Sequence, residues 1–169
     1  MVRAGWDADR VVGNVALSVE KARAGNVPVI WVQHESEELV RGSLDWQWVP
    51  RLVPAAGETL IAKRFPSSFE DTGLEAELAR LDASHIVLAG AQTNWCMRAT
   101  AYAALDKGYD LTLVGDAHTT DSVDLGDGQT IEAQATVQDL NLVFQWLRYP
   151  GRACTTALVA ELAFSRTSA

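Results

Sequence analysis

The sequence predicts a three-layer α/β fold, an α-β-α sandwich in which a mainly parallel sheet lies between helices. Short apolar runs, typical of strands buried on both faces, occur at 28–32, 85–89 and 111–114. Helix-like segments separate these runs, and this alternation is typical of a parallel sheet joined by crossover helices. The 169 residues, 48% of them apolar, are enough for a single domain with its own core.

The first half of the chain begins with an amphipathic pattern. Val11, Val15 and Val19 fall on one face of a helix, and Gly25 follows its end. The segment after the first apolar run is long, irregular and rich in tryptophan and proline, as many binding loops are. The elements expected here are a helix over 9–24, a strand over 28–32, the irregular segment 34–57, a strand over 59–62 and a helix marked by Leu74, Leu78 and Leu81.

A strand, a tight turn and a helix follow one another most clearly in the middle of the chain. The apolar run 85–89 leads into the turn 90–94, and the helix expected over 95–107 ends before Gly108. Beyond this unit the periodicity weakens. The elements expected there are a strand over 111–114, a helix over 130–140, a strand or extended segment over 141–146 and a helix over 155–164.

Composition restricts the partners and the location of the protein. The net charge of −8, from 14 basic and 22 acidic residues, argues against binding to nucleic acid or to anionic membranes. No apolar stretch approaches the roughly 18 residues of a membrane span, and residues 1–10 hold no apolar run of a signal peptide. Because the two cysteines form no disulfide framework, we expect a cytoplasmic protein. Three widely spaced histidines argue against a metal site, and no cofactor is expected.

Cys96 is the strongest candidate for a reactive group. It is expected in the first turn of a helix, directly after a strand, where ligands bind at the carboxyl edge of parallel sheets. The positive end of the helix dipole stabilises a thiolate there, and backbone N–H groups of the turn can face an oxyanion. Thr93 or Asn94 is expected to cap this helix through its side chain. The alternative is a buried structural cysteine, a common state of an unpaired thiol.

Lys63 is the second candidate, because it follows the apolar run 59–62 at the end of an expected strand. An ammonium group close to Cys96 would favour the thiolate by charge attraction. The alternative is a solvated surface lysine, the usual state of this residue type.

At four places in order, the sequence resembles the isochorismatase-like cysteine hydrolases. Residues 90–101 (GAQTNWCMRATA) resemble the nucleophile motif of that family, and residues 108–117 (GYDLTLVGDA) resemble the strand that follows it. Lys63 with residues 67–69 (SSF) resembles the catalytic-lysine segment, and residues 26–34 (NVPVIWVQH) resemble the second strand. Four matches in the family's order are more specific than any one of them.

The resemblance implies a fold and a site. The family has a six-stranded parallel sheet between helices and a triad of cysteine, lysine and aspartate, in which the aspartate acts as base toward the thiol. Here Cys96 would be the nucleophile and Lys63 the lysine, and the backbone N–H groups of Gln92 and Cys96 would form the oxyanion hole. A cis peptide bond would join Ala91 to Gln92. Homo-oligomers and a small-molecule substrate are also implied.

The candidate substrate-binding side chains are one histidine and several aromatic residues. Aromatic rings line many small-molecule pockets, although a role in the core is the alternative for each of them. The nicotinamidase branch of the family binds a metal through an Asp/His cluster; the corresponding segment here offers only His34 with three glutamates, so no metal is predicted. The candidates are His34, Trp46, Trp48, Phe69 and Trp95.

The chain departs from the family at its N-terminus. The family's first strand, which ends in the catalytic aspartate, has no counterpart before the first helix, so the single domain over 1–169 is expected to be N-terminally incomplete. Asp7 and Asp9 align with helix-start positions, where N-capping is their expected role. The missing strand would lie in the middle of the sheet and leave backbone groups of its neighbours unpaired. An upstream segment, a partner subunit or the atypical C-terminal segment could fill the gap.

The first functional hypothesis is hydrolysis of a small amide or carbamoyl compound through a thioester on Cys96. A catalytically impaired family member that acts through binding or oligomerisation is the alternative, because the aspartate is missing. An isochorismate-type vinyl-ether hydrolase is a further alternative within the family. A dinucleotide-binding domain is disfavoured, since no G-x-G-x-x-G follows an expected strand.

Overall fold

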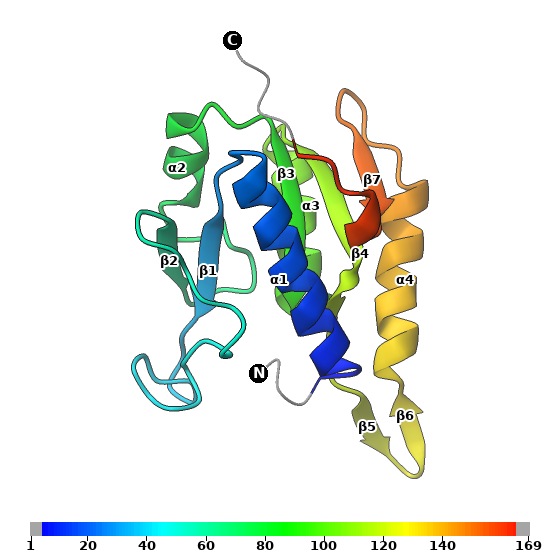
Figure 1. Cartoon of the computed structure of the whole chain (residues 1–169). Helices are drawn as coiled ribbons and strands as arrows, with labels where there is room; N and C mark the ends of the chain where they lie inside the picture. The colour runs from blue at the N-terminus through cyan, green and yellow to red at the C-terminus, as the bar shows by residue number, and fades with distance from the viewer. Residues whose placement is uncertain (1–4, 165–169) are drawn as a thin grey trace.

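A computed structural model describes residues 5–164 and contains a parallel sheet between two helical layers (Figure 1). The predicted three-layer fold with a mainly parallel sheet is confirmed. All ladders among the five long strands are parallel. They join β1 (Ile30–His34) to β2 (Thr59–Lys63), β3 (His85–Ala91) to β4 (Asp110–Thr119), and β4 to β7 (Cys154–Ala157).

Side chains of β3 alternate between two cores, one on each face of the sheet. Ile86 and Leu88 pack on the larger core, whereas Val87 and Ala89 pack on the smaller one. The larger core is covered by α2 (Leu74–Arg80), α3 (Arg98–Asp106) and α4 (Ala133–Trp146). The smaller core is covered by α1 (Ala8–Ala24) and the short 3-10 helix η3 (Val159–Glu161).

The parallel sheet is interrupted in its middle. Within residues 5–164 no ladder joins β1 to β3, although the strands follow one another in the order β2, β1, β3, β4, β7 across Figure 1. The side chains of β3 stay partly exposed along the strand, whereas β4, which is paired on both sides, is buried over most of its length. This interruption agrees with the prediction that a central strand is missing.

As far as Phe164, the C-terminal segment does not fill this interruption, so that part of the prediction is wrong. The strand β7 pairs with the side of β4 that faces away from β3. The following η3 is held against α1, because Lys21 Nζ donates hydrogen bonds to the carbonyl oxygens of Val159, Ala160 and Leu162 at 2.8, 2.9 and 3.1 Å.

The sequence prediction fails most clearly after residue 120. A hairpin of β5 (Val123–Gly126) and β6 (Gln129–Ile131) precedes α4, so the helix expected over 130–140 starts later. The helix then continues through 141–146, where an extended segment was predicted. The helix predicted over 155–164 is also wrong, since β7 and η3 occupy its first part. Helical spacing of the buried Val137, Leu140 and Phe144 outweighs the strand preference of the residues around Phe144.

The start of α1 differs in detail from the expected capping. Asp7 occupies the N-cap position with a left-handed backbone (φ 51°), but its side chain makes no cap hydrogen bond. Its carboxylate instead pairs with Arg10, and Asp9 lies in the first turn of the helix. The preceding Trp6 is fixed to the end of β4, because its N–H donates to the Thr120 carbonyl at 2.9 Å.

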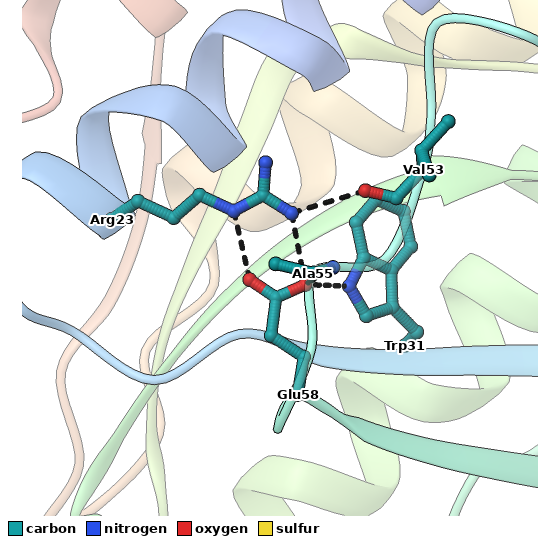
Figure 2. Close-up of polar contacts among 5 residues, drawn as sticks. All are labelled: Arg23, Trp31, Val53, Ala55 and Glu58. Atoms are coloured by element: carbon teal, nitrogen blue, oxygen red, sulfur yellow. Dashed lines mark hydrogen bonds and ion pairs between the residues drawn. The ribbon is translucent and has the colours of Figure 1, made fainter.

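One carboxylate anchors the long irregular segment between β1 and β2 (Figure 2). Glu58 accepts two hydrogen bonds from Arg23 of α1, at 2.8 and 2.9 Å, and one from Trp31 Nε1 of β1 at 2.6 Å. The backbone N–H of Ala55 donates a further bond at 2.8 Å, and Arg23 also donates to the Val53 carbonyl at 3.1 Å. These hydrogen bonds, led by that from Arg23, lower the pKa of Glu58 to about 2.

Candidate active site

Cys96 lies in a distorted first turn of the helix that follows β3. The cis peptide bond expected between Ala91 and Gln92 is present. The π-helix η2 (Thr93–Met97) comes next and leads directly into α3, so the helical segment starts two residues earlier than predicted. Cys96 is a partly exposed residue, which is compatible with attack on a ligand. Short π-helical segments occur frequently at functional sites.

Lys63 is buried at the end of β2 and points at the sulfur of Cys96. Lys63 is only 5% exposed, and its Nζ lies 3.0 Å from Cys96 Sγ. Nζ also donates to the carbonyl oxygens of Phe65 and Pro66, at 2.8 and 3.0 Å. Three acceptors therefore surround the ammonium group, and they hold its charge beside the sulfur.

The loop that follows Lys63 is fixed to the helix that carries Cys96. The backbone N–H of Ser68 donates to Thr100 Oγ1 at 3.0 Å, and the two hydroxyl oxygens are also 3.0 Å apart. Ser68 and Thr100 are both buried. This contact joins the β2 side of the molecule to α3 next to the pairing of Lys63 with Cys96.

The turn that precedes Cys96 is held from two sides. Gln92 is extended (φ −97°, ψ 146°), and its carbonyl accepts the backbone N–H groups of Trp95 and Met97 at 3.2 and 3.1 Å. Its side chain donates to Asp121 Oδ2 at 2.6 Å. The other oxygen of Asp121 is buried and has no hydrogen-bond partner in the part of the chain that the structure describes.

Neither residue expected to cap the helix does so through its side chain. Thr93 Oγ1 lies 2.9 Å from Nδ1 of the buried His118, and Asn94 Oδ1 accepts a hydrogen bond from Thr120 Oγ1 at 2.6 Å. Both side chains thus bind to the end of β4, and the capping prediction is wrong. The side chains of the first turn therefore hold it to the neighbouring strand and do not cap its backbone.

His34 lies next to Lys63 at the carboxyl edge of the sheet. The two residues are register partners at the ends of β1 and β2, so their side chains project from the same face. Burial, and then the charge of Lys63, lower the pKa of His34, which favours the neutral imidazole. Its Nδ1 is buried without a hydrogen-bond partner among residues 5–164.

The aromatic candidates are distributed over different surroundings. Phe69 is buried in the larger core and stacks on Tyr109, with ring centroids 5.9 Å apart. Trp48 packs edge-on against Trp31 at 5.2 Å, in the segment before β2. Trp95 is next to Cys96 in sequence and is 59% exposed. Trp46 belongs to the same irregular segment as Trp48, and its carbonyl accepts a hydrogen bond from Gln33.

No carboxylate within residues 5–164 makes a hydrogen bond to the Cys96 sulfur, whose one hydrogen-bond partner there is Lys63. The same residues contain no group of three or more His, Cys, Asp or Glu side chains arranged to hold a metal ion. Among them, no helix combines the length and the apolar character needed to cross a bilayer.

Comparison with known proteins decides the family. A family model described as the isochorismatase domain matches residues 1–140. The chain belongs to the isochorismatase family. The family expected from four sequence segments is therefore confirmed.

Two curated relatives of this isochorismatase-family chain are enzymes or effectors by name. The secreted isochorismatase effector Isc1 of Verticillium dahliae is 32% identical over 108 residues, which cover 62% of this chain and 57% of the relative. Streptothricin hydrolase of Streptomyces noursei is 28% identical over 134 residues, which cover 73% of this chain and 52% of the relative. The chain thus spans little more than half the length of these two relatives.

Solved structures of the family share the fold. An isochorismatase from Pseudomonas putida superposes with a TM-score of 0.82 at 29% identity. The superposition covers 94% of this chain and 80% of the P. putida protein. N-carbamoylsarcosine amidase from Thermoplasma acidophilum superposes with a TM-score of 0.70 at 22% identity, covering 90% of this chain and 84% of the amidase. The second likeness concerns the fold alone.

Sequence reasoning missed two polar residues beside the turn that carries Cys96, His118 and Asp121. Both follow the apolar run 111–114, where the strand was expected to end near Asp116. The strand continues to Thr119 instead. The polar residues after Gly115 show no hydrophobic periodicity that would predict a strand. The pairing of Ala91 with Thr119 nevertheless requires extended backbone at this end of β4.

Proposed function

We propose that the chain is a cysteine-dependent hydrolase of small amide or carbamoyl compounds. The observation that carries the proposal is the 3.0 Å contact between Lys63 Nζ and the Sγ of Cys96, a partly exposed residue. A positive charge beside the sulfur favours the thiolate, which is the nucleophilic form. The relative named as streptothricin hydrolase supports hydrolysis as the reaction class.

In the proposed reaction the Cys96 thiolate attacks the carbonyl carbon and a carbon–sulfur bond forms. The backbone N–H groups of Gln92 and Cys96 stabilise the negative oxygen of the tetrahedral intermediate. Collapse of the intermediate breaks the carbon–nitrogen bond, the amine or ammonia leaves with a proton taken from solvent, and a thioester remains on Cys96. Water then attacks the thioester, releases the acid and restores the thiol. His34, which is partly exposed next to Lys63 and has a buried Nδ1 without a hydrogen-bond partner among the described residues, is proposed to bind the substrate.

Alkylation by iodoacetamide tests the reactive cysteine, and Cys154 serves as an internal control. Burial raises the pKa of the Cys154 thiol, which donates a hydrogen bond to the Phe144 carbonyl at 3.4 Å. We expect Cys96 to be alkylated at least about tenfold faster than Cys154 at neutral pH, measured by peptide mass spectrometry. We expect Lys63→Met to remove most of this difference, because the thiolate loses the adjacent charge. Equal rates at the two cysteines in the wild type would contradict the proposal.

Turnover is tested separately with a panel of small primary amides and N-carbamoyl amino acids. Release of ammonia that disappears in Cys96→Ala, with an acyl group trapped on Cys96 of the wild type, is the expected result. Release that persists in Cys96→Ala would show that another group does the chemistry.

A second candidate function is binding without catalysis. The specific observation in its favour is that no carboxylate in residues 5–164 reaches the Cys96 sulfur to act as base. This candidate would be favoured if Cys96 of the wild type is alkylated rapidly but the protein releases ammonia from no compound of the panel.

We also propose that the chain forms homo-oligomers. The hairpin of β5 and β6 leaves Val123, Leu125 and Ile131 exposed, at 39, 57 and 48%. Apolar side chains that face water on neighbouring strands are typical of contact surfaces. The cytoplasmic location stays a prediction, and the Verticillium relative is named as a secreted effector.

A further inference from the structure

A chain of buried and part-buried hydrogen bonds runs from the turn that carries Cys96 through β4 to α4. Thr93 Oγ1 lies 2.9 Å from His118 Nδ1, and His118 Nε2 lies 2.9 Å from Asn141 Oδ1. Asn141 Nδ2 in turn lies 2.8 Å from the carbonyl oxygen of Gly115. Thr93 and His118 are both 0% exposed, so water does not compete for the contact between them.

The chemistry of the groups fixes the direction of each bond. A backbone carbonyl only accepts, so Asn141 Nδ2 donates to Gly115 and Asn141 Oδ1 is left as an acceptor. His118 Nε2 must then carry the proton, and Nδ1 is the acceptor for the Thr93 hydroxyl. Burial lowers the pKa of His118 and outweighs the opposing effect of the Asn141 hydrogen bond, so the ring is neutral as this direction requires.

The close approach of α4 to the sheet depends on a glycine in β4. A Cβ atom at Gly115 would lie 3.1 Å from Asn141 Oδ1 and 2.8 Å from Thr156 Cγ2. The backbone of Asn141 also accepts a hydrogen bond from Thr156 Oγ1 at 3.3 Å. Asn141 is therefore fixed by both β4 and β7, and it offers His118 a rigid support.

We propose that His118 is a positioning residue that holds the Cys96 turn in register with Lys63 through the hydroxyl of Thr93. Thr93 is the first residue of η2, and Cys96 is the fourth. Loss of the hydroxyl contact frees the first turn to shift while β4, α4 and Lys63 stay in place. The 3.0 Å approach of Nζ to Sγ then lengthens, and the thiolate loses part of its stabilisation. This inference rests on the proposed role of Cys96 as nucleophile.

Thr93→Val tests the proposal, because valine keeps the shape of threonine and removes the hydroxyl. We expect the rate of Cys96 alkylation by iodoacetamide at neutral pH to fall about fivefold, the scale of one lost buried hydrogen bond. Thr93→Ser keeps the hydroxyl and removes a methyl group, so we expect it to react at close to the wild-type rate even where it is less stable. Chemical denaturation of each variant separates the loss of stability from the loss of reactivity.

The structure offers a matched control at the other end of the sheet. Thr112 Oγ1 lies 2.9 Å from Nε2 of the exposed His85 and 3.0 Å from Thr155 Oγ1, so a threonine and a histidine also meet there, in a part-buried contact. Thr112→Val makes the same substitution in β4 far from the carboxyl edge, and we expect an unchanged rate at Cys96.

Three results would overturn the positioning role: a wild-type rate in Thr93→Val, an equal fall in Thr93→Ser, or an equal fall in Thr112→Val. Failure of the proposed function looks different. In that case Cys96 of the wild type reacts no faster than Cys154, before any variant is compared.

Discussion

Glu58 shows at the scale of one residue how a charge far from the reactive sulfur can set stability. Its pKa of about 2 lies below the ordinary value of 4.5, so the folded state favours the ionised form. The resulting stabilisation is complete above pH 4.5 and disappears as the pH falls toward 2. We expect Glu58→Gln to lower the free energy of unfolding by about 1 kcal/mol at pH 7, since water screens the partly exposed Arg23.

Urea denaturation of the wild type and of Glu58→Gln at pH 7 and pH 3 measures this effect. The difference between the two proteins should shrink at the lower pH, and Glu70→Gln, at an exposed carboxylate, should change little at either. A difference that grows toward pH 3 would contradict the assignment of the ionised form.

Single residues of the site were predictable to different degrees. Cys96 and Lys63 stand in sequence motifs, because the chemistry needs a thiol after a turn and an ammonium group at a strand end. His118 and Asp121 stand in a polar run whose spacing indicates neither helix nor strand. Their partners, Thr93 and Gln92, are more than 20 residues away along the chain, and only the ladder of β3 with β4 brings them close.

At the scale of elements, apolar periodicity correctly predicted the helices and strands that have a regular apolar pattern. The helix over 9–24 and the strands near 30, 60 and 87 are present, because each is bounded by turn residues and contains a regular apolar pattern. The hairpin before α4 was missed, although the sequence 126–128 (GDG) is typical of a tight turn and all three residues have positive φ. Helix α4 was cut short because valine, phenylalanine and tryptophan near its end favour strands.

The last turns of α4 provide a test of this corrected element. Phe144 is 0% exposed in the larger core, so we expect Phe144→Ala to lower the free energy of unfolding by about 3–5 kcal/mol. Trp146 is 69% exposed on the same helix, and Trp146→Ala should change stability by less than about 0.5 kcal/mol. Equal losses measured by thermal or chemical unfolding would place both residues on an extended segment rather than a helix.

At the scale of the whole molecule, the contact of Lys63 with Cys96 joins two separate pieces of sheet. Lys63 ends the β1–β2 piece, whereas Cys96 follows β3 in the three-stranded piece. Within residues 5–164 these pieces share no ladder, so side-chain contacts such as Lys63 with Cys96 and Ser68 with Thr100 hold them together. Contacts of this kind are weaker than a continuous ladder and open locally before global unfolding.

We therefore expect reactivity to be lost on heating before secondary structure is lost. The alkylation rate of Cys96 is first corrected for the temperature dependence of the same reaction with free cysteine. The corrected rate should drop at a temperature several degrees lower than the unfolding midpoint measured by far-ultraviolet circular dichroism. Coincident transitions would mean that the two pieces separate only when the whole chain unfolds.

The divided sheet also has a consequence for handling the protein. Among the described residues, the rows of peptide groups on the facing edges of β1 and β3 share no ladder, and such rows can recruit an extended chain from another molecule, as exposed strand edges do in aggregation and strand exchange. A high protein concentration would then favour aggregated or strand-swapped assemblies. A short apolar peptide able to lie parallel to β1 and β3 would compete for these rows and reduce aggregation, measured as turbidity.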